Sequence, residues 1–180
     1  MFTNRIRKYY PVFLLVLVVV LASAFMITTE EISKVALESQ QDPAMLAQLQ
    51  QIFPEANYYR YDKKTDIYTL YNNSRQEIGY AFYGEGFGYR SKITVLIGLK
   101  DKETIENIIV ITQFEDPAYW EKLVKNNFLD QFIELEVVEC YPSYSWQPGG
   151  VDCVSGATFS SKGVINAVRD AILEKIQYLD

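Results

Sequence analysis

Short runs rich in Val, Ile, Thr and Tyr, separated by polar turns, fill the middle of the chain. Runs of this length and composition predict β-strands. Two of them bracket the polar stretch 100–104 and predict the strongest hairpin in the chain. The strands expected from this pattern are residues 57–62, 66–71, 76–83, 91–99, 105–112 and 132–138.

Helical patterns flank these strands. In residues 160–178, apolar side chains recur at helical spacing and predict one buried stripe, formed by Val164, Ile165, Val168, Ala171, Ile172 and Ile176. Residues 117–126 predict a short helix. Residues 30–51 favour helix, with a break at Asp42-Pro43 that restarts it as an N-cap followed by proline. This order of elements predicts an α+β fold, an antiparallel sheet covered by helices.

The N-terminal region predicts a membrane helix. Residues 11–27 carry no charge over 17 positions, just long enough to span a bilayer. Three basic residues precede this run and Glu30-Glu31 follow it, so we expect the N-terminus in the cytoplasm and the rest outside. A cleaved signal peptide ending at Ala22–Ala24 is the alternative. We therefore expect three parts: a tail and transmembrane helix (1–28), a helical linker (29–55) and an extracytoplasmic domain (56–180), periplasmic and held at the inner, cytoplasmic membrane.

Composition excludes several kinds of function. The net charge is −6, and because the first eight residues are basic, the remainder is more acidic still, which argues against nucleic-acid binding. The chain has no histidine, which removes Ser-His-Asp catalysis and most zinc sites, and we expect no metal. Its two cysteines, Cys140 and Cys153, are too few for an iron–sulfur cluster. Either a disulfide or two free thiols fits their spacing. Any redox chemistry therefore requires an organic cofactor.

The stretch "SGATFSSKG" at residues 155–163 is rich in glycine and hydroxyl groups and leads into the last helix. Helix starts offer unpaired amide groups and the positive end of the helix dipole, so a phosphate can sit there. Lys162 can add positive charge. The alternative is purely structural: Ser160 or Ser161 caps the helix.

The same residues carry a resemblance to a known family. "VDCVSGATFSSKGV" resembles the flavinylation motif of the FMN-binding domain family, Asp-Gly-x-Ser/Thr-Gly-Ala-Thr-x-Ser/Thr. This family includes the G subunit of the Rnf electron-transport complex, which the chain resembles most, and the C subunit of the sodium-pumping NADH:quinone oxidoreductase. The matching residues are Asp152, Ser155, Gly156, Ala157, Thr158 and Ser160. Cys153 departs from the motif, because the family usually has glycine there.

A second segment resembles the family less closely. Glu115 and Pro117 match a Glu-Thr-Pro-Gly-Leu-Gly motif that the family uses near the flavin ring. Asp116 replaces its threonine, and the residues that follow Pro117 also differ. A glycine cluster at 84, 86 and 88 precedes this segment. It lies between two expected strands, so a hairpin or bulge is the better interpretation than a phosphate loop.

The resemblance implies a function. A flavin transferase would attach FMN through its phosphate to Thr158, with Ser160, Ser161 and Lys162 nearby and Glu115 to Pro117 near the ring. The protein would be an electron-transfer subunit of an Rnf-type, ion-transporting membrane complex rather than a stand-alone enzyme, with the other membrane subunits as partners. Two alternatives are an extracytoplasmic flavin-dependent reductase of a small acceptor and a non-redox anion-binding module. Tyr141, Tyr144 and Trp146 form an aromatic loop that either packs locally or faces the flavin.

Overall fold

The computed structural model describes residues 15–20, 41–137 and 150–179. It divides into two compact units, Met1–Gln41 and Asp42–Asp180, and in the first unit residues 15–20 are helical. In the described part of the chain, no helix combines the length and the apolar character needed to cross a membrane. Most of the expected transmembrane helix, residues 11–27, lies outside the described residues.

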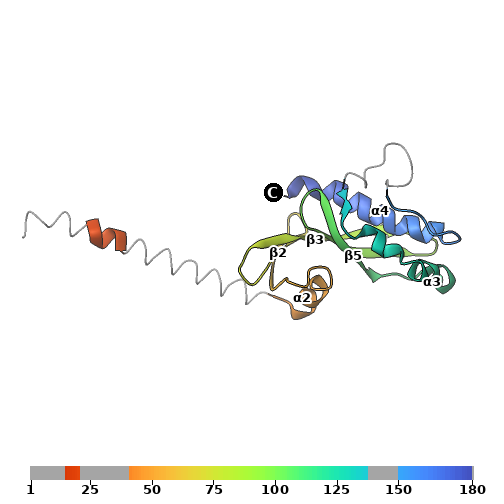
Figure 1. Cartoon of the computed structure of the whole chain (residues 1–180), viewed down its shortest axis with the longest axis horizontal. Helices are drawn as coiled ribbons and strands as arrows, with labels where there is room; N and C mark the ends of the chain where they lie inside the picture. The colour runs from red at the N-terminus through yellow and green to blue at the C-terminus, as the bar shows by residue number, and fades with distance from the viewer. Residues whose placement is uncertain (1–14, 21–40, 138–149, 180) are drawn as a thin grey trace, which may run out of the picture. The chain divides into compact units, whose positions relative to one another are not determined.

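The second unit is built on one antiparallel sheet of six strands, in the order β1-β2-β3-β4-β5-β6 (Figure 1). Every strand therefore pairs with its neighbour in sequence, as expected for strands joined by short turns. The α+β prediction is confirmed. The strands are β1 (Tyr58–Asp62), β2 (Ile67–Tyr71), β3 (Glu77–Phe87), β4 (Lys92–Leu99), β5 (Thr104–Thr112) and β6 (Leu135–Glu136).

Helix α2 (Pro43–Leu49) begins as the sequence predicts, with Asp42 as N-cap and proline at the first helical position. The Asp42 side chain accepts a hydrogen bond from the Ala44 amide at 2.9 Å. The helix and the turn after it pack on one face of the sheet in a small core, formed by Leu49, Ile52, Phe53, Ala56, Leu70, Ala81 and Leu96. The last helix, residues 158–175, packs in a separate core on the opposite face of the sheet.

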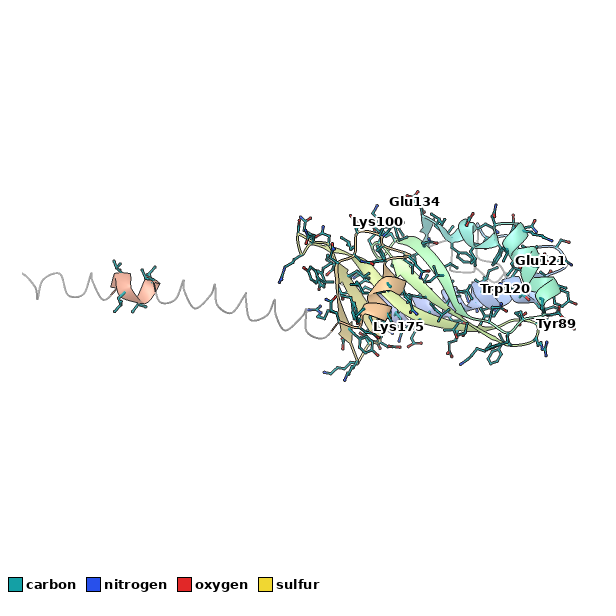
Figure 2. The ribbon with its side chains drawn as sticks, turned by 90° about the horizontal axis from the view of Figure 1, so that it is seen from below. Tyr89, Lys100, Trp120, Glu121, Glu134 and Lys175 are labelled. Atoms are coloured by element: carbon teal, nitrogen blue, oxygen red, sulfur yellow. The ribbon has the colours of Figure 1, made fainter. Side chains whose placement is uncertain are left out.

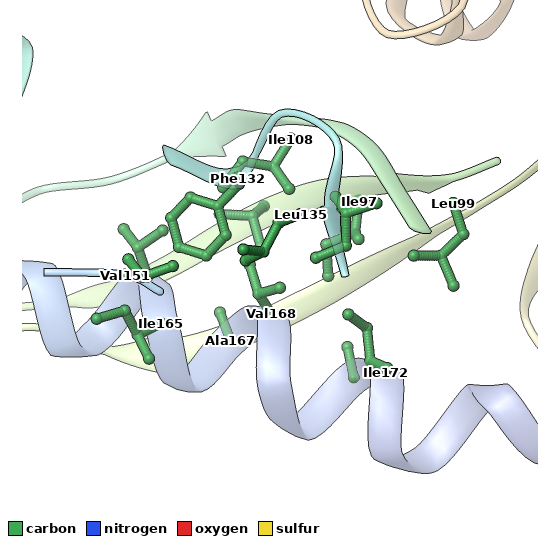
Figure 3. Packing of buried hydrophobic residues seen from close by; sticks show 14 of the residues in the cluster. Ile97, Leu99, Ile108, Phe132, Leu135, Val151, Ile165, Ala167, Val168 and Ile172 are labelled. Carbon is green, nitrogen blue, oxygen red and sulfur yellow. The ribbon is translucent and has the colours of Figure 1, made fainter. Parts of the chain in front are cut away.

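Helix α4 (Thr158–Lys175) covers the other face, over strands β3 and β4, and a short 3₁₀ helix, η3 (Ile176–Tyr178), follows it. Its apolar stripe packs against β4, β5 and the segment 132–135 (Figure 3). Five of the six residues expected in the stripe are buried, and Ile176 is partly buried against the same core. The helix starts two residues earlier than the sequence pattern predicts, at Thr158.

The glycine cluster lies in the β3–β4 hairpin, as expected, but two of its members have a further role. Gly88 lies in the turn, where its amide donates to the Ser91 carbonyl. Gly84 and Gly86 lie inside β3, paired in regular register with β4 and without a bulge. A Cβ added at Gly86 would lie 2.0 Å from the Gly163 carbonyl oxygen, and one at Gly84 would lie 2.4 Å from that of Ala167. The missing side chains let the backbone of α4 rest directly on β3.

Residues 117–132, which follow β5, pack beside α4 on the same face. Helix α3 (Pro117–Lys125) matches the predicted helix to within one residue, and a 3₁₀ helix, η1 (Phe128–Phe132), follows it. The strand predicted over 132–138 is only two residues long, because Phe132 ends η1 and Glu134 adopts a positive φ. Phe128 and Phe132 are fully buried and fasten this segment to the core.

The close contact between β3 and α4 makes Gly86 a sensitive position. We expect Gly86→Ala to lower the free energy of unfolding by about 1–3 kcal/mol, because the new methyl group must push α4 away from the sheet. Chemical denaturation of the full chain measures this change. The control is Glu85→Ala, the adjacent residue, whose exposed ion pair with Lys92 contributes little. Equal stabilities of the two variants would contradict the packing role.

Candidate functional site

Glu115 joins three segments at one end of the sheet. It follows β5, and its buried carboxylate accepts hydrogen bonds from the amides of Tyr89, Arg90 and Ser91 in the β3–β4 turn, at 2.8, 2.9 and 2.8 Å. The Ser160 hydroxyl, in the first turn of α4, donates a further hydrogen bond to it. One side chain therefore fixes the turn and the start of the last helix relative to each other.

These hydrogen bonds also keep Glu115 ionised. Burial of its carboxyl group raises the pKa, but the hydrogen bonds from Ser160 and from the turn amides of Arg90, Ser91 and Tyr89 outweigh burial. The pKa of Glu115 is therefore lower than its ordinary value. A carboxylate whose oxygens already accept several hydrogen bonds is suited to holding structure, and it is poorly suited to donating a proton.

The two serines expected to cap α4 do not do so. Ser160 is fully buried and directed at Glu115. Ser161, also fully buried, donates to the Ala157 carbonyl at 3.0 Å and accepts from the Val154 amide at 3.1 Å. The N-cap position is Ala157, and no side chain caps the helix. The amide groups of the first turn consequently remain available for an anion.

The turn before α4 depends on a glycine. Gly156 has φ +74°, a left-handed conformation that glycine adopts without strain. Its carbonyl oxygen accepts a hydrogen bond at 3.2 Å from Nζ of Lys122, which lies on α3. A Cβ at Gly156 would lie 2.7 Å from that same nitrogen. The glycine thus permits both the turn and the close approach of a positive charge.

A pocket of about 260 Å³ opens beside this turn. One wall is the turn itself and the first residues of α4, and the other is aromatic. Tyr89 and Tyr119 meet edge to face with ring centroids 4.9 Å apart, and the ring of Phe159 lies 6.2 Å from that of Tyr89. Tyr89 lies at the same end of the sheet as Trp120 and Glu121 of α3 (Figure 2). The lining residues are Tyr89, Tyr119, Gly156, Ala157, Thr158, Phe159 and Ser160.

The structure brings most of the predicted site residues to this end of the sheet. Thr158 is exposed at the first position of α4 and lines the pocket with Gly156, Ala157 and Ser160. Glu115 does not line the pocket, but it accepts a hydrogen bond from the hydroxyl of Ser160, which does. Ser155 is exposed in the turn, and Lys162 is half-buried one turn further into the helix.

Three predicted residues have structural roles instead of lining the pocket. Asp116 caps α3, accepting from the Ala118 amide at 2.9 Å, and Pro117 is the first residue of that helix. Asp152 is exposed, and its backbone is held by the side chain of Gln131 at 2.8 and 3.2 Å.

Two further predictions concern residues that the structure does not describe. Cys153 is half-buried, and Cys140, which either forms a disulfide with it or is a second free thiol, lies outside the described residues. The aromatic loop with Tyr141, Tyr144 and Trp146 also lies outside them. The disulfide and the role of that loop stay predictions.

Sequence reasoning missed four residues around the pocket: Tyr89, Tyr119, Lys122 and Phe159. Phe159 stands at a position that the flavinylation motif leaves open, and Tyr119 stands at one where the chain departs from the second motif. Lys122 lies more than 30 residues from the turn that it contacts. Only the packing of α3 beside α4 reveals that contact. The sequence signal was limited to a lysine within the helix predicted over residues 117–126.

The ionised state of Glu115 predicts a pH effect on stability. Because its folded pKa lies below its unfolded value of about 4.3, its stabilising contribution is present above that pH and is lost as the pH falls through the folded pKa. We expect Glu115→Gln to lower the free energy of unfolding by about 2–4 kcal/mol at pH 7, because an amide group would face backbone donors.

Urea denaturation of both proteins between pH 7 and pH 3 measures this effect. The difference between them should shrink below about pH 4.3. The matched control is Glu136→Gln, an exposed carboxylate on the edge strand β6, which should cost little. A difference that stays constant down to pH 3 would mean that the charge of Glu115 is not what stabilises the turn.

Comparison with known proteins identifies the domain that contains this pocket. Residues 88–173 match the FMN-binding domain family. A curated relative, the G subunit of the ion-translocating oxidoreductase complex of Methanosarcina acetivorans, is 30% identical over 102 residues. Those residues are 56% of this chain and 53% of the relative, so the match spans about half of the relative's length.

A solved structure is also similar. The crystal structure of Shewanella oneidensis NqrC aligns with a TM-score of 0.49 and 17% sequence identity, over 69% of this chain and 70% of that chain. The segment that matches the family runs from the β3–β4 turn through α3 into α4, and it contains every residue that lines the pocket. The resemblance found in the sequence is confirmed over residues 88–173, which match the FMN-binding domain family.

Proposed function

We propose that this protein is a membrane-anchored electron-transfer subunit that carries FMN bound through its phosphate to Oγ of Thr158. The observation that carries the proposal is the position of Thr158. Its side chain is exposed, it opens helix α4, and it lines the pocket of an FMN-binding domain. The neighbouring hydroxyls of Ser160 and Ser161 are both buried and engaged, which leaves Thr158 as the accessible acceptor in this turn of the helix.

The residues around the pocket fit FMN. The first turn of α4 has no side-chain cap, so its amides suit a phosphate. Gly156 lets the backbone approach that phosphate closely. The exposed rings of Tyr89 and Phe159 offer the flat apolar surface that an isoalloxazine requires. Bound FMN would supply redox chemistry that the protein's own side chains lack.

Thr158 would acquire its cofactor in a transfer reaction. Its Oγ would form a new P–O bond to the FMN phosphorus and release the hydroxyl proton, while the pyrophosphate bond of a flavin dinucleotide donor breaks and a nucleoside monophosphate leaves. A flavin transferase would catalyse this step, because the described part of the site offers no general base beside Thr158. Glu115, the nearby carboxylate, is already saturated with hydrogen bonds.

The site favours an electron carrier over a reductase. Glu115, the buried carboxylate beside the pocket, is held ionised and engaged in hydrogen bonds, so it is poorly suited to protonating a bound substrate. The similar protein from M. acetivorans is named as part of an ion-translocating oxidoreductase complex. We propose that this chain likewise works within an Rnf-type complex, with other membrane subunits as its electron partners.

Residues 11–27 would anchor the domain. Their uncharged run is long enough to span a bilayer, and the basic residues before it favour a cytoplasmic N-terminus. The FMN-binding domain would then lie outside the cytoplasmic membrane. A covalent bond to Thr158 would retain the cofactor there, where free FMN is scarce.

Mass spectrometry tests the attachment site. In cells that contain a flavin transferase, the full chain should gain the mass of one FMN less one water on the peptide that holds Thr158, and Thr158→Ala should abolish this gain. The variant should keep its stability within about 0.5 kcal/mol, because the side chain is exposed and caps nothing. Thr158→Ser should keep some flavin, and the control Ser74→Ala, which removes an exposed hydroxyl between β2 and β3, should keep all of it. Flavin on another residue would contradict the proposal.

Reporter fusions test the topology. A reporter that is active only outside the cytoplasm should be active when it is fused after Asp180, and inactive when it is placed before Pro11. The expectation follows from the basic cluster Arg5–Lys8 on one side of the apolar run and Glu30-Glu31 on the other. The opposite pattern of activity would reverse the proposed orientation.

A further inference from the structure

Lys122 connects helix α3 to the turn that precedes Thr158. Its ammonium group donates to the Gly156 carbonyl oxygen at 3.2 Å and lies 5.8 Å from the ring centroid of Tyr119. Tyr119 and Gly156 both line the pocket. The ammonium group of Lys122 therefore lies at the edge of the pocket. The residue that it contacts, Gly156, is two positions before the proposed attachment site, Thr158.

The charge of Lys122 is not neutralised by the described residues. Within 41–137 and 150–179, no carboxylate lies within ion-pair distance of its Nζ. Lys125, one turn further along the same helix, is instead paired with Glu121 at 2.9 Å. An ammonium group has three donors, so the bond to Gly156 leaves Lys122 with capacity for an anion.

A phosphate at Thr158 requires such a charge. A phosphodiester carries one negative charge, and the protein as a whole is acidic, with a net charge of −6. The hydroxyl groups of Ser160 and Ser161, which would otherwise be donors, already bind Glu115 and the backbone. Helix amides supply partial positive charge, and a full charge requires a basic side chain.

Lys122 satisfies this requirement better than Lys162, the cation that the sequence suggested. Lys162 is half-buried in α4 and, among the described residues, makes no hydrogen bond to the turn. Lys122 is already in contact with that turn, and Gly156 is the residue that allows its approach. We propose that Lys122 is the residue that pairs with the FMN phosphate at Thr158. This inference rests on the proposed attachment of FMN.

The test measures how fast FMN is incorporated into the full chain. Purified full-length protein without flavin is incubated with a flavin transferase and flavin adenine dinucleotide, and intact mass follows the modified fraction over time. Lys122→Gln keeps a hydrogen-bond donor for Gly156 but removes the charge, and Lys122→Arg keeps the charge. Lys125→Gln is the matched control for loss of one charge from α3, and Lys162→Gln tests the other lysine. Thermal melting verifies that every variant is folded.

We expect Lys122→Gln to acquire FMN about three- to fivefold more slowly than the wild type, the size of effect typical of an exposed ion pair. Lys122→Arg and Lys125→Gln should stay within about twofold of the wild type. In fully loaded protein, the phosphorus NMR signal of the phosphodiester should shift in Lys122→Gln and stay unchanged in Lys125→Gln.

Other results would overturn the inference. Incorporation into Lys122→Gln at the wild-type rate would do so, as would Lys122→Arg being as slow as Lys122→Gln, which would indicate a role in shape rather than charge. A larger effect of Lys162→Gln than of Lys122→Gln would assign the phosphate to Lys162. An unshifted phosphorus signal in Lys122→Gln would place Lys122 away from the phosphate. Failure of the wild type to acquire any flavin would instead refute the proposed function itself.

Discussion

The geometry of the pocket depends on the carboxylate of Glu115. A buried charge is unfavourable unless hydrogen bonds compensate for its lost hydration, and here the β3–β4 turn and Ser160 provide them. The compensation works in both directions. The turn amides would lack partners without the carboxylate, and the first turn of α4 would lose its fixed position beside the turn. The pocket therefore depends on a side chain, Glu115, that does not itself line it.

This arrangement separates the roles of the hydroxyl groups near the start of α4. Ser160 and Ser161 face inward and hold the helix against the protein, whereas Thr158 faces outward into the pocket. Helical geometry explains the division between Thr158 and Ser160, because residues two positions apart point to nearly opposite sides of the helix axis. One short segment can thus be rigid and still present a reactive group to solvent.

Local sequence signals predicted much of this fold. Asp42-Pro43 marked the start of α2, the apolar stripe identified α4, and the runs of β-branched residues gave the strands, because each of these features acts over a few neighbouring residues. What sequence reasoning did not predict depends on contacts between distant segments. The burial of Ser160 against Glu115 reversed its expected capping role, and the contact of Lys122 with Gly156 joins two helices.

The glycines of β3 illustrate the same limit. Their spacing resembled a loop signal, but their meaning comes from the helix packed above them. A Cβ on Gly86 would lie 2.0 Å from the Gly163 carbonyl oxygen, and a Cβ on Gly163 would lie 2.8 Å from the backbone of Gly88, so neither can gain a Cβ while the facing backbone keeps its place. Among related sequences that pack α4 this closely, we therefore expect these two positions to stay glycine. In a homologue with a larger residue at one of them, we expect the last helix to lie farther from the sheet. The entrance to its pocket should be correspondingly wider.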